Sequence, residues 1–274
     1  MARAWYGSLM QPLDSLSEAV ACRISGVFTD IDGTVTDAGK LTAAAYDALW
    51  RLKGAGLRVV PVTGRPAGWC DLIAREWPVD GVIGENGALA FTEVGGRLDR
   101  SYHPAAALTD LRARLDTIRE TILTEVPGTR VAKDQPFRQF DLAIDFCEEP
   151  PDLGHDAAEK VKAIFERFGA HAKISSIHVN GWFGDYDKLS MVKRFCRDRW
   201  DEDLDATADR YLFCGDSPND EPMFAFFPNA CGVANIKEFA SRLTSLPRFV
   251  ATQAGASGFV EIVDTLLSRR ADKR

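Results

Sequence analysis

The chain has 274 residues, of which 46% are hydrophobic and 27% are charged, a balance typical of globular proteins. Its formal net charge of −7 at pH 7 argues against nucleic-acid binding, which depends on a basic face. No apolar run reaches the roughly 20 residues that cross a bilayer, and the N-terminal segment lacks the continuous apolar stretch of a secretory signal. The six cysteines form no CxxC pair, which favours reduced thiols in a cytoplasmic protein.

The first part of the chain alternates predicted strands and helices. Short apolar runs typical of buried strands cover residues 24–29, 57–62 and 79–83, as expected for a sheet core. A helix is predicted over residues 41–52, where apolar residues share one face, and another over 66–77, where proline suits the first turn. Strand–helix–strand units of this kind predict a parallel sheet.

The last part of the chain repeats this alternation. Strands are predicted over residues 211–214, 230–233 and 248–251. Helices are predicted over residues 188–200, 222–227, 237–246 and 259–267. We therefore expect both ends of the chain to build one α/β domain around a parallel sheet.

The middle of the chain has a different pattern. It predicts helices over residues 108–126 and 157–168, and strands over 140–146 and 172–179, the first of which alternates like a half-exposed strand. Antiparallel strands with helices on one face form an α+β module. We expect residues 92–183 to be an inserted domain of this kind.

The expected organisation has three parts. An N-terminal extension covers residues 1–23, and a core domain covers 24–91 and 184–274, with the inserted domain between its two segments. Residues 14–20 of the extension predict a short helix that packs on the core. The rest of the extension follows neither pattern, and we expect it to be mobile.

Two carboxylates stand at the end of the first predicted strand. Asp30 and Asp32 are two residues apart, so their side chains point the same way if the extended geometry continues. Like charges that close repel each other, and such a pair usually holds a cation or keeps one proton. Gly33 permits a sharp turn after the strand. An acidic turn without a ligand is the alternative interpretation.

A second acidic segment follows the predicted strand 211–214. Asp216, Asn219 and Asp220 supply two carboxylates and an amide, the oxygen ligands that Mg²⁺ prefers. Taken alone, the segment also fits a turn followed by a helix cap.

Two further segments offer groups for an anion. Thr63 and Gly64 lie between a strand and a helix, where a hydroxyl and backbone N–H groups suit phosphate, although an empty threonine cap is more common. Lys188 stands at a predicted helix start, where a cation opposes the helix dipole, so it faces either an anion or solvent. All four segments follow strands or precede helices at the edge where α/β sheets bind ligands. Together they supply what phosphoryl transfer through an acyl-phosphate needs.

Taken in chain order, the four segments resemble the motifs of the haloacid dehalogenase-like superfamily. The matching positions are Asp30-Ile31-Asp32-Gly33-Thr34, Thr63, Lys188 and Gly215-Asp216 through Asp220. The inserted domain resembles the class IIB cap of the Cof-type, sucrose-phosphate phosphatase and mannosyl-3-phosphoglycerate phosphatase branch. Glu85-Asn86-Gly87-Ala88, after the third predicted strand, is also similar to that branch. The resemblance implies a Rossmann-like α/β core with a parallel sheet and an inserted α+β cap.

The resemblance also implies roles for the acidic residues. Asp30 would attack phosphorus and form an aspartyl-phosphate, while Asp32 would protonate the leaving alcohol and then activate water. Mg²⁺ would lie between Asp30, the backbone carbonyl of Asp32, and Asp216, with Asp220 in support. The phosphate would be bound by Thr63, Gly64, Lys188 and Asn219.

The cap would contact the rest of the substrate. Residues placed to do so are Arg138, His178, Asn180 and Trp182. Trp182 could stack on a sugar, or it could pack the hinge between the domains. Arg138, on a predicted strand edge, is more often solvated than ligand-bound.

The sequence thus predicts an enzyme, a Mg²⁺-dependent phosphatase acting on a small phosphorylated metabolite such as a sugar phosphate or glycosyl-phosphoglycerate. A phosphosugar mutase of the phosphomannomutase type is an alternative, and it would need a second basic clamp, for which Arg130, Lys133 and Arg138 are available. A non-catalytic metabolite sensor is less consistent with filled acid–base and metal positions. We expect no nucleic-acid or membrane partner, and the sequence contains no indication of an oligomeric state.

Overall fold

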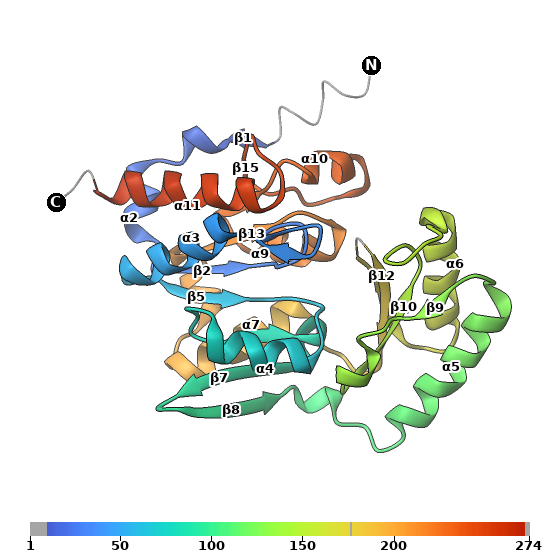
Figure 1. Ribbon diagram of the computed structural model, residues 1–274. Coiled ribbons are helices and arrows are strands. Elements are labelled where there is room, and N and C mark those ends of the chain that lie inside the picture. The colour runs from blue at the N-terminus through green and yellow to red at the C-terminus, as the bar shows by residue number, and fades with distance from the viewer. Residues whose placement is uncertain (1–9, 176, 272–274) are drawn as a thin grey trace.

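A computed structural model describes residues 10–175 and 177–271. Both ends of the chain form a large lobe, and the middle of the chain forms a smaller one beside it (Figure 1). The large lobe contains a six-stranded sheet in the order β1-β15-β14-β13-β2-β5, and all of its strand pairs are parallel. The predicted α/β class is therefore confirmed. The strands are β1 (Gln11–Pro12), β2 (Gly26–Thr29), β5 (Arg58–Pro61), β13 (Tyr211–Gly215), β14 (Ala230–Gly232) and β15 (Phe249–Val250).

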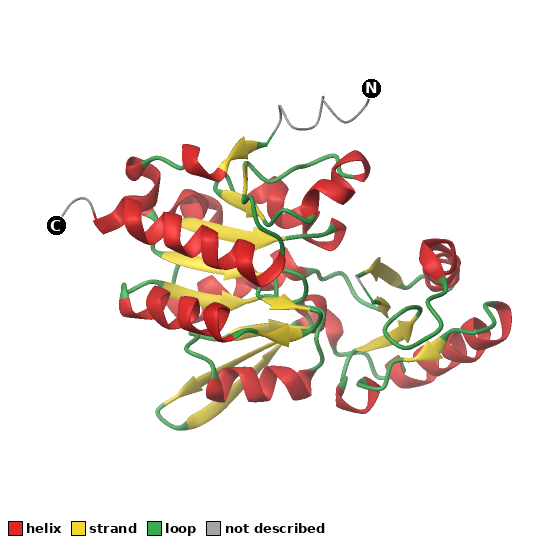
Figure 2. Ribbon diagram, turned by 45° about the horizontal axis from the view of Figure 1, so that its top comes forward, coloured by secondary structure: helices red, strands yellow, loops and turns green. Residues whose placement is uncertain are grey.

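Helices cover both faces of this sheet (Figure 2). One layer contains α2 (Glu18–Arg23), α3 (Ala43–Gly54) and α11 (Gly255–Ala271), and the other contains α7 (Lys188–Trp200) and α9 (Glu221–Phe226). Alternate residues of β2 pack against opposite layers, Val27 with the first and Phe28 with the second. Because both faces are covered, a ligand can reach the central strands only at their ends.

The third predicted strand forms a separate small sheet. β6 (Val82–Gly84), β7 (Leu89–Val94) and β8 (Arg97–Tyr102) are antiparallel, and a single bridge between Val62 and Ile83 joins them to the main sheet. Helix α4 (Ala67–Glu76) packs on this sheet. The expected domain boundary between residues 91 and 92 falls inside β7, and since β7 and β8 pair along their whole length, we propose that the inserted domain begins after Tyr102.

The smaller lobe has a four-stranded antiparallel sheet in the order β11-β12-β10-β9. Its outer face carries two helices, and its other face is turned toward the large lobe (Figure 1). Its elements are α5 (Leu111–Glu125), β9 (Arg130–Val131), β10 (Asp141–Asp145), α6 (Gly154–Arg167), β11 (His171–Ile174) and β12 (His178–Trp182). This is the α+β architecture expected for the inserted domain.

Two predictions for the strands of this lobe are wrong. The single strand expected over residues 172–179 is a hairpin of β11 and β12, because Ser175 closes a tight turn by accepting a hydrogen bond from the His178 backbone N–H at 3.0 Å. The strand expected to be half exposed, β10, is buried on both faces. Leu142 and Ile144 pack on the helices, and on the other face Asp141 and Asp145 accept hydrogen bonds from Arg138 and Arg130.

Other segments of the core also differ from expectation. The helix predicted over 237–246 is short, with α10 (Ile236–Phe239) followed by a single 3-10 turn. The described part of the predicted extension belongs to the core, because β1 pairs with β15 and Leu13 and Leu16 are buried in it. The helix expected at 14–20 is a 3-10 turn followed by α2, and residues 1–9 lie outside the described chain. The remaining elements are β3 (Thr36–Asp37), β4 (Lys40–Leu41) and α8 (Leu204–Thr207).

Candidate active site

Asp30 and Lys188 meet at the carboxyl end of the parallel sheet. Asp30 directly follows β2 and is 3% exposed, and Lys188 is the first residue of α7 and is 4% exposed. Lys188 Nζ donates hydrogen bonds of 2.8 Å to Asp30 Oδ1 and to Asp220 Oδ1. Of the two interpretations of Lys188, an anion partner and a solvated surface position, the structure supports the first.

Three buried carboxylates surround this lysine. One oxygen from each of Asp30, Asp216 and Asp220 lies within 4.8 Å of the others. Asp216 follows β13, and its two oxygens accept hydrogen bonds from Thr34 Oγ1 at 3.3 Å and Asn235 Nδ2 at 2.7 Å. Three carboxylates against one ammonium leave the cluster short of positive charge, which fits a divalent cation with oxygen ligands.

The pKa values in the cluster reflect this imbalance. The pKa of Asp30 is raised to about 7, chiefly by burial; Lys188 lowers it, and the neighbouring Asp220 and Asp32 add to the rise. Burial also raises the pKa of Asp216 well above its ordinary value, and Asp30 adds to that effect. A cation bound among these oxygens would favour their charged forms.

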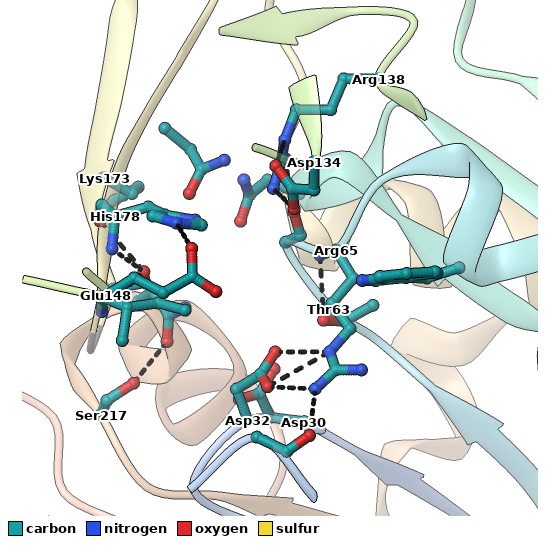
Figure 3. Close-up of a pocket in the computed structure, with 18 residues that line it drawn as sticks. Asp30, Asp32, Thr63, Arg65, Asp134, Arg138, Glu148, Lys173, His178 and Ser217 are labelled. Carbon is teal, nitrogen blue, oxygen red and sulfur yellow. Dashed lines mark hydrogen bonds and ion pairs between the residues drawn. The ribbon is translucent and has the colours of Figure 1, made fainter. Parts of the chain in front are cut away.

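Asp32 lies beside Asp30 but faces a different partner. Arg65 donates to both of its carboxylate oxygens, from Nη2 to Oδ1 at 2.6 Å and from Nε to Oδ2 at 2.9 Å (Figure 3). This bidentate ion pair was not predicted. The only indication of it in the sequence is that Arg65 follows Thr63 and Gly64 just before the next helix. A cation there is not stabilised by the helix dipole.

The remaining predicted core residues line one cavity with Asp30. The cavity has a volume of about 220 Å³ and is bordered by Asp32, Thr63, Gly64 and Asn219 on the core side. Thr63 Oγ1 accepts a hydrogen bond from the Arg65 backbone N–H at 3.1 Å. The structure thus brings the four predicted segments to one place.

Two predicted cap residues border this cavity, and each is hydrogen-bonded to a carboxylate of the cap. His178 Nε2 lies 2.7 Å from Glu148 Oε2, and Asn180 Nδ2 donates to Asp141 Oδ2 at 2.9 Å. Both residues line the cavity. They come from β12, where alternate residues share the face turned toward the core.

Arg138 is buried, contrary to the expectation of a solvated strand edge. Its guanidinium donates to Asp134 Oδ2 at 2.8 Å and to Asp141 Oδ2 at 3.0 Å. It also donates to the Gly64 carbonyl oxygen at 2.9 Å, which joins the cap to the core loop. Two carboxylates already match its charge, so we interpret Arg138 as a residue that holds the loop in place.

Glu85 forms a second connection between the lobes. It is fully buried, and its carboxylate accepts hydrogen bonds from the backbone N–H of Ala67 in the core at 3.0 Å and of Phe140 in the cap connection at 2.6 Å. Burial raises the pKa of Glu85 to about 7, and Asp141 contributes in the same direction. The sequence pointed to this segment but assigned Glu85 no role.

Trp182 does not border the cavity that contains Asp30. It is 3% exposed and packs on Tyr186, with ring centroids 5.9 Å apart, and its Nε1 donates to the Tyr186 carbonyl oxygen at 3.2 Å. Because the ring is buried and packed on Tyr186, the structure favours the hinge-packing interpretation over the sugar-stacking one.

Lys173 was missed as a candidate. It lies on β11 and lines the same cavity, and it makes no ion pair with any residue that the structure describes. Its position opposite Asn180 on the neighbouring strand follows only once the strand 172–179 is seen to be a hairpin, and Figure 3 shows it on the same side of the cavity as His178.

Comparisons with known proteins agree with this geometry. Residues 27–122 match a family described as haloacid dehalogenase-like hydrolase. The chain is 28% identical to a phosphoglycolate phosphatase of Pyrobaculum neutrophilum, over 91% of this chain and 97% of that protein. It is 25% identical to a phosphoglycolate phosphatase of Methanospirillum hungatei, over 88% of this chain and 95% of that protein.

Solved structures show the same fold. A Thermoplasma acidophilum protein superimposes with a TM-score of 0.70 and 17% identity, covering 89% of this chain and 98% of that one. The sucrose-phosphatase of Synechocystis, solved with sucrose and phosphate, has a TM-score of 0.62 and 14% identity, with coverage of 89% and 98%. Within residues 10–175 and 177–271, no helix is both long and apolar enough to span a membrane.

Proposed function

We propose that this chain, which is similar to haloacid dehalogenase-like hydrolases and to phosphoglycolate phosphatases, is a Mg²⁺-dependent phosphatase with a class IIB cap. It would hydrolyse a small phosphorylated acid through an aspartyl-phosphate. The proposal depends on the buried cluster around Asp30. Oxygens of Asp30, Asp216 and Asp220 lie close together there, and Lys188 donates hydrogen bonds to Asp30 and Asp220. A surface turn or an empty helix cap would not bury three carboxylates together.

In the proposed reaction, Asp30 is the nucleophile. Lys188 holds one oxygen of its carboxylate and leaves the other to attack phosphorus, as the bond from phosphorus to the leaving oxygen breaks. Asp32 gives its proton to that oxygen. Water then attacks phosphorus in the aspartyl-phosphate, Asp32 takes the proton of the water, and inorganic phosphate leaves with Asp30 restored.

A divalent cation fits the charge deficit of the cluster. Asp30, Asp216 and the backbone carbonyl of Asp32 would hold Mg²⁺, with Asp220 in support, and the ion would neutralise charge on the phosphoryl group. The chain's own contribution is to keep these oxygens preorganised, since Thr34, Asn235 and Lys188 each fix one of them by a hydrogen bond.

Arg65 connects substrate binding to the proposed acid. In the structure Arg65 is engaged with Asp32, and both border the cavity. A substrate dianion competes for the guanidinium, because phosphate is a strong bidentate partner of arginine. Its displacement toward the phosphate would free Asp32 to carry a proton.

The cavity favours a smaller substrate than the sugar phosphates expected from the sequence. Its volume of about 220 Å³ is below the roughly 300–1,000 Å³ of ordinary ligand pockets. Lys173 offers a cation for a second anionic group, and the relatives that the chain matches over most of its length are named phosphoglycolate phosphatases. We therefore favour a phosphorylated hydroxy acid such as phosphoglycolate.

The mutase alternative finds less support. Of the basic residues expected to form a second phosphate clamp, Arg130 pairs with Asp145 and Lys133 pairs with Glu149, and neither borders the cavity. The charge of Arg138 is matched by its two carboxylate partners. The occupied acid–base positions likewise favour an enzyme over a metabolite sensor.

Phosphate release from a panel of esters tests the proposal. Phosphoglycolate, 3-phosphoglycerate, glucose 6-phosphate and sucrose 6-phosphate are compared with Mg²⁺ and no bisphosphate activator. We expect the small acid to have a kcat/KM at least about tenfold above the sugar phosphates, the size of one added ion pair. Preference for a sugar phosphate would reject the substrate class, and a requirement for a bisphosphate would favour the mutase.

A further inference from the structure

Asn86 carries a buried donor with no partner. Its residue is 4% exposed, and Nδ2 makes no hydrogen bond among the described residues. An unpaired buried amide costs about 1–3 kcal/mol, so native proteins keep few of them without a reason. The side chain borders the same cavity as Asp30 and Thr63, which makes a ligand atom the natural partner.

The turn that carries Asn86 is fixed on two sides. Its backbone N–H donates to the Thr63 carbonyl oxygen at 3.1 Å. A Cβ on Gly64 would lie 3.2 Å from Asn86 Oδ1 and 3.3 Å from Nδ2, so the amide rests against Gly64. On the other side, a Cβ on Gly87 would lie 2.1 Å from the carbonyl oxygen of Asp187. The turn is therefore wedged between the Thr63 loop and the start of α7.

Its backbone conformation suits asparagine. Asn86 has a φ of 55°, in the left-handed region that asparagine, aspartate and glycine adopt most readily. The side-chain amide of Asn86 therefore lies between the Thr63 loop and the start of α7, where Lys188 stands. Gly64 N–H also makes no hydrogen bond to any described residue, so two donors face the place where the proposed phosphate would lie.

We propose that Asn86 Nδ2 donates a hydrogen bond to a phosphoryl oxygen of the substrate bound at Asp30. The inference rests on the proposed phosphatase function and adds a substrate-contacting residue to it. Phosphoryl oxygens only accept hydrogen bonds, and negative charge is spread over the three equatorial ones in the transition state. A preorganised donor at that position lowers the barrier as well as binding the substrate.

A neighbouring cavity supplies the competing explanation. Asn86 also borders a space of about 510 Å³ that Tyr186 borders too, and the Tyr186 hydroxyl is likewise buried without a partner. A water molecule between the two side chains would satisfy both. In that case Asn86 would act through packing and would not touch phosphate.

Three variants separate these explanations. Asn86→Asp keeps the shape and tolerates the left-handed backbone but replaces the donor by an acceptor, Asn86→Gly removes the side chain, and Tyr186→Phe removes only the hydroxyl in the neighbouring cavity. Each is assayed for kcat and KM with phosphoglycolate, for inhibition by orthovanadate, and for binding of inorganic phosphate. Circular dichroism and Tm show whether each variant is folded.

We expect Asn86→Gly to lower kcat/KM by about 100-fold, the scale for losing one transition-state donor, and Asn86→Asp to lower it further, because its carboxylate also repels the phosphate. Vanadate inhibition and phosphate binding should weaken in parallel, and Tyr186→Phe should stay near wild type. Folded Asn86 variants with wild-type kcat/KM and wild-type vanadate inhibition would overturn the proposal. So would an equal loss in Tyr186→Phe, which would assign Asn86 to the neighbouring cavity.

Failure of the proposed function is visible separately. A wild-type protein that binds inorganic phosphate but hydrolyses no ester would reject the function, and the phosphate affinities of the Asn86 variants would still decide the role of the amide. If Asn86→Asp does not fold, Asn86→Gly answers the same question, because glycine accepts the φ of 55° without strain.

Discussion

The core side and the cap side of the cavity differ in how their charges are matched. Around Asp30 the core buries three carboxylates against a single lysine. In the cap, Arg138 lies between Asp134 and Asp141, and His178 faces Glu148. An unbalanced buried cluster is costly unless a counter-charge binds, so the core side is built for a cation and a phosphate. On the cap side, Asp134 and Asp141 fully engage the guanidinium of Arg138, so this side is built to hold a shape.

The connections between the lobes extend this contrast. Arg138 reaches the Gly64 carbonyl, and Glu85 accepts backbone N–H groups from Ala67 and Phe140. Both lie beside the loop that would bind phosphate. Contacts between the lobes thus fix the backbone of the core loop that would bind phosphate. Of the cap residues, Lys173 is the one expected to contact the substrate. Five perturbations test whether the two sides divide the work in this way.

The largest effect is expected from Asp30→Asn. The amide removes the nucleophile and we expect turnover to fall by at least about a thousandfold, the scale for losing a covalent catalyst. Steady-state phosphate release measures the loss, and circular dichroism confirms that the fold persists. A fully active variant would remove Asp30 from the nucleophile role and with it the distinction between the two sides.

Removal of the metal should silence the enzyme reversibly. Excess EDTA should abolish phosphate release and added Mg²⁺ should restore it, because the acidic cluster lacks its counter-charge without a cation. Mg²⁺ should also raise the Tm of the wild type but not that of Asp216→Asn, since binding to the folded state alone stabilises it. Undiminished activity in excess chelator would count against the metal.

On the cap side, Arg138→Gln should act on stability. The variant leaves the buried Asp141 without its cation, which costs about 3–5 kcal/mol, and it frees the Gly64 carbonyl. Urea unfolding measures the cost. Arg167→Gln is the matched control, because Arg167 pairs with Glu125 at the surface of the same lobe and exposed pairs contribute little. Equal stabilities for the two variants would contradict the structural role.

The pH dependence of stability should carry a contribution from Glu85. Its pKa is raised from an ordinary 4.5 to about 7 by burial, so the folded state holds a proton that the unfolded chain releases. The resulting stabilisation is present below pH 4.5 and is lost as the pH rises through about 7. At about 1.4 kcal/mol per pKa unit, it amounts to about 3 kcal/mol.

Unfolding of wild type and Glu85→Gln between about pH 5 and pH 8 measures this loss. The free energy of unfolding of the wild type should fall with pH more steeply than that of Glu85→Gln, because glutamine does not titrate. The contributions of the acidic cluster are common to both proteins. If the free energies of unfolding of the two proteins changed in parallel with pH, the Glu85 carboxyl would not titrate in this range.

The smallest effect is expected at Lys173. Lys173→Gln should raise KM for phosphoglycolate about fivefold to tenfold, the worth of one partly exposed ion pair. Its KM for p-nitrophenyl phosphate, which has no second anion, should change little. Lys133→Gln, an exposed cap lysine away from the cavity, is the control. Equal changes for both substrates would show that Lys173 does not select for the acid.

The core of the site was predictable because the geometry of a parallel sheet does most of the positioning. Asp30 and Asp216 directly follow the neighbouring strands β2 and β13, and carboxyl ends of parallel strands share one edge. The sequence separation of 158 residues between Asp30 and Lys188 therefore did not matter. Strand ends and helix starts were sufficient to bring the residues together.

The cap was less predictable, because its contacts depend on register and on distance along a strand. His178, Asn180 and Trp182 alternate on one face of β12, yet Trp182 packs at the hinge and does not border the cavity with the other two. Arg138 lies in a turn, where periodicity does not indicate that Asp134 and Asp141 match its charge. The hairpin between β11 and β12 has a serine turn in place of the glycine or asparagine that usually indicates one.

The central claim is that a single buried oxygen of Asp30 becomes phosphorylated. The most direct test is to mix the Mg²⁺-loaded enzyme with phosphoglycolate, quench in acid, reduce the acyl-phosphate with borohydride, and map the modified residue by mass spectrometry. The account predicts modification at Asp30 in the wild type and none in Asp30→Asn. Modification at another residue, or none while turnover proceeds, would contradict it.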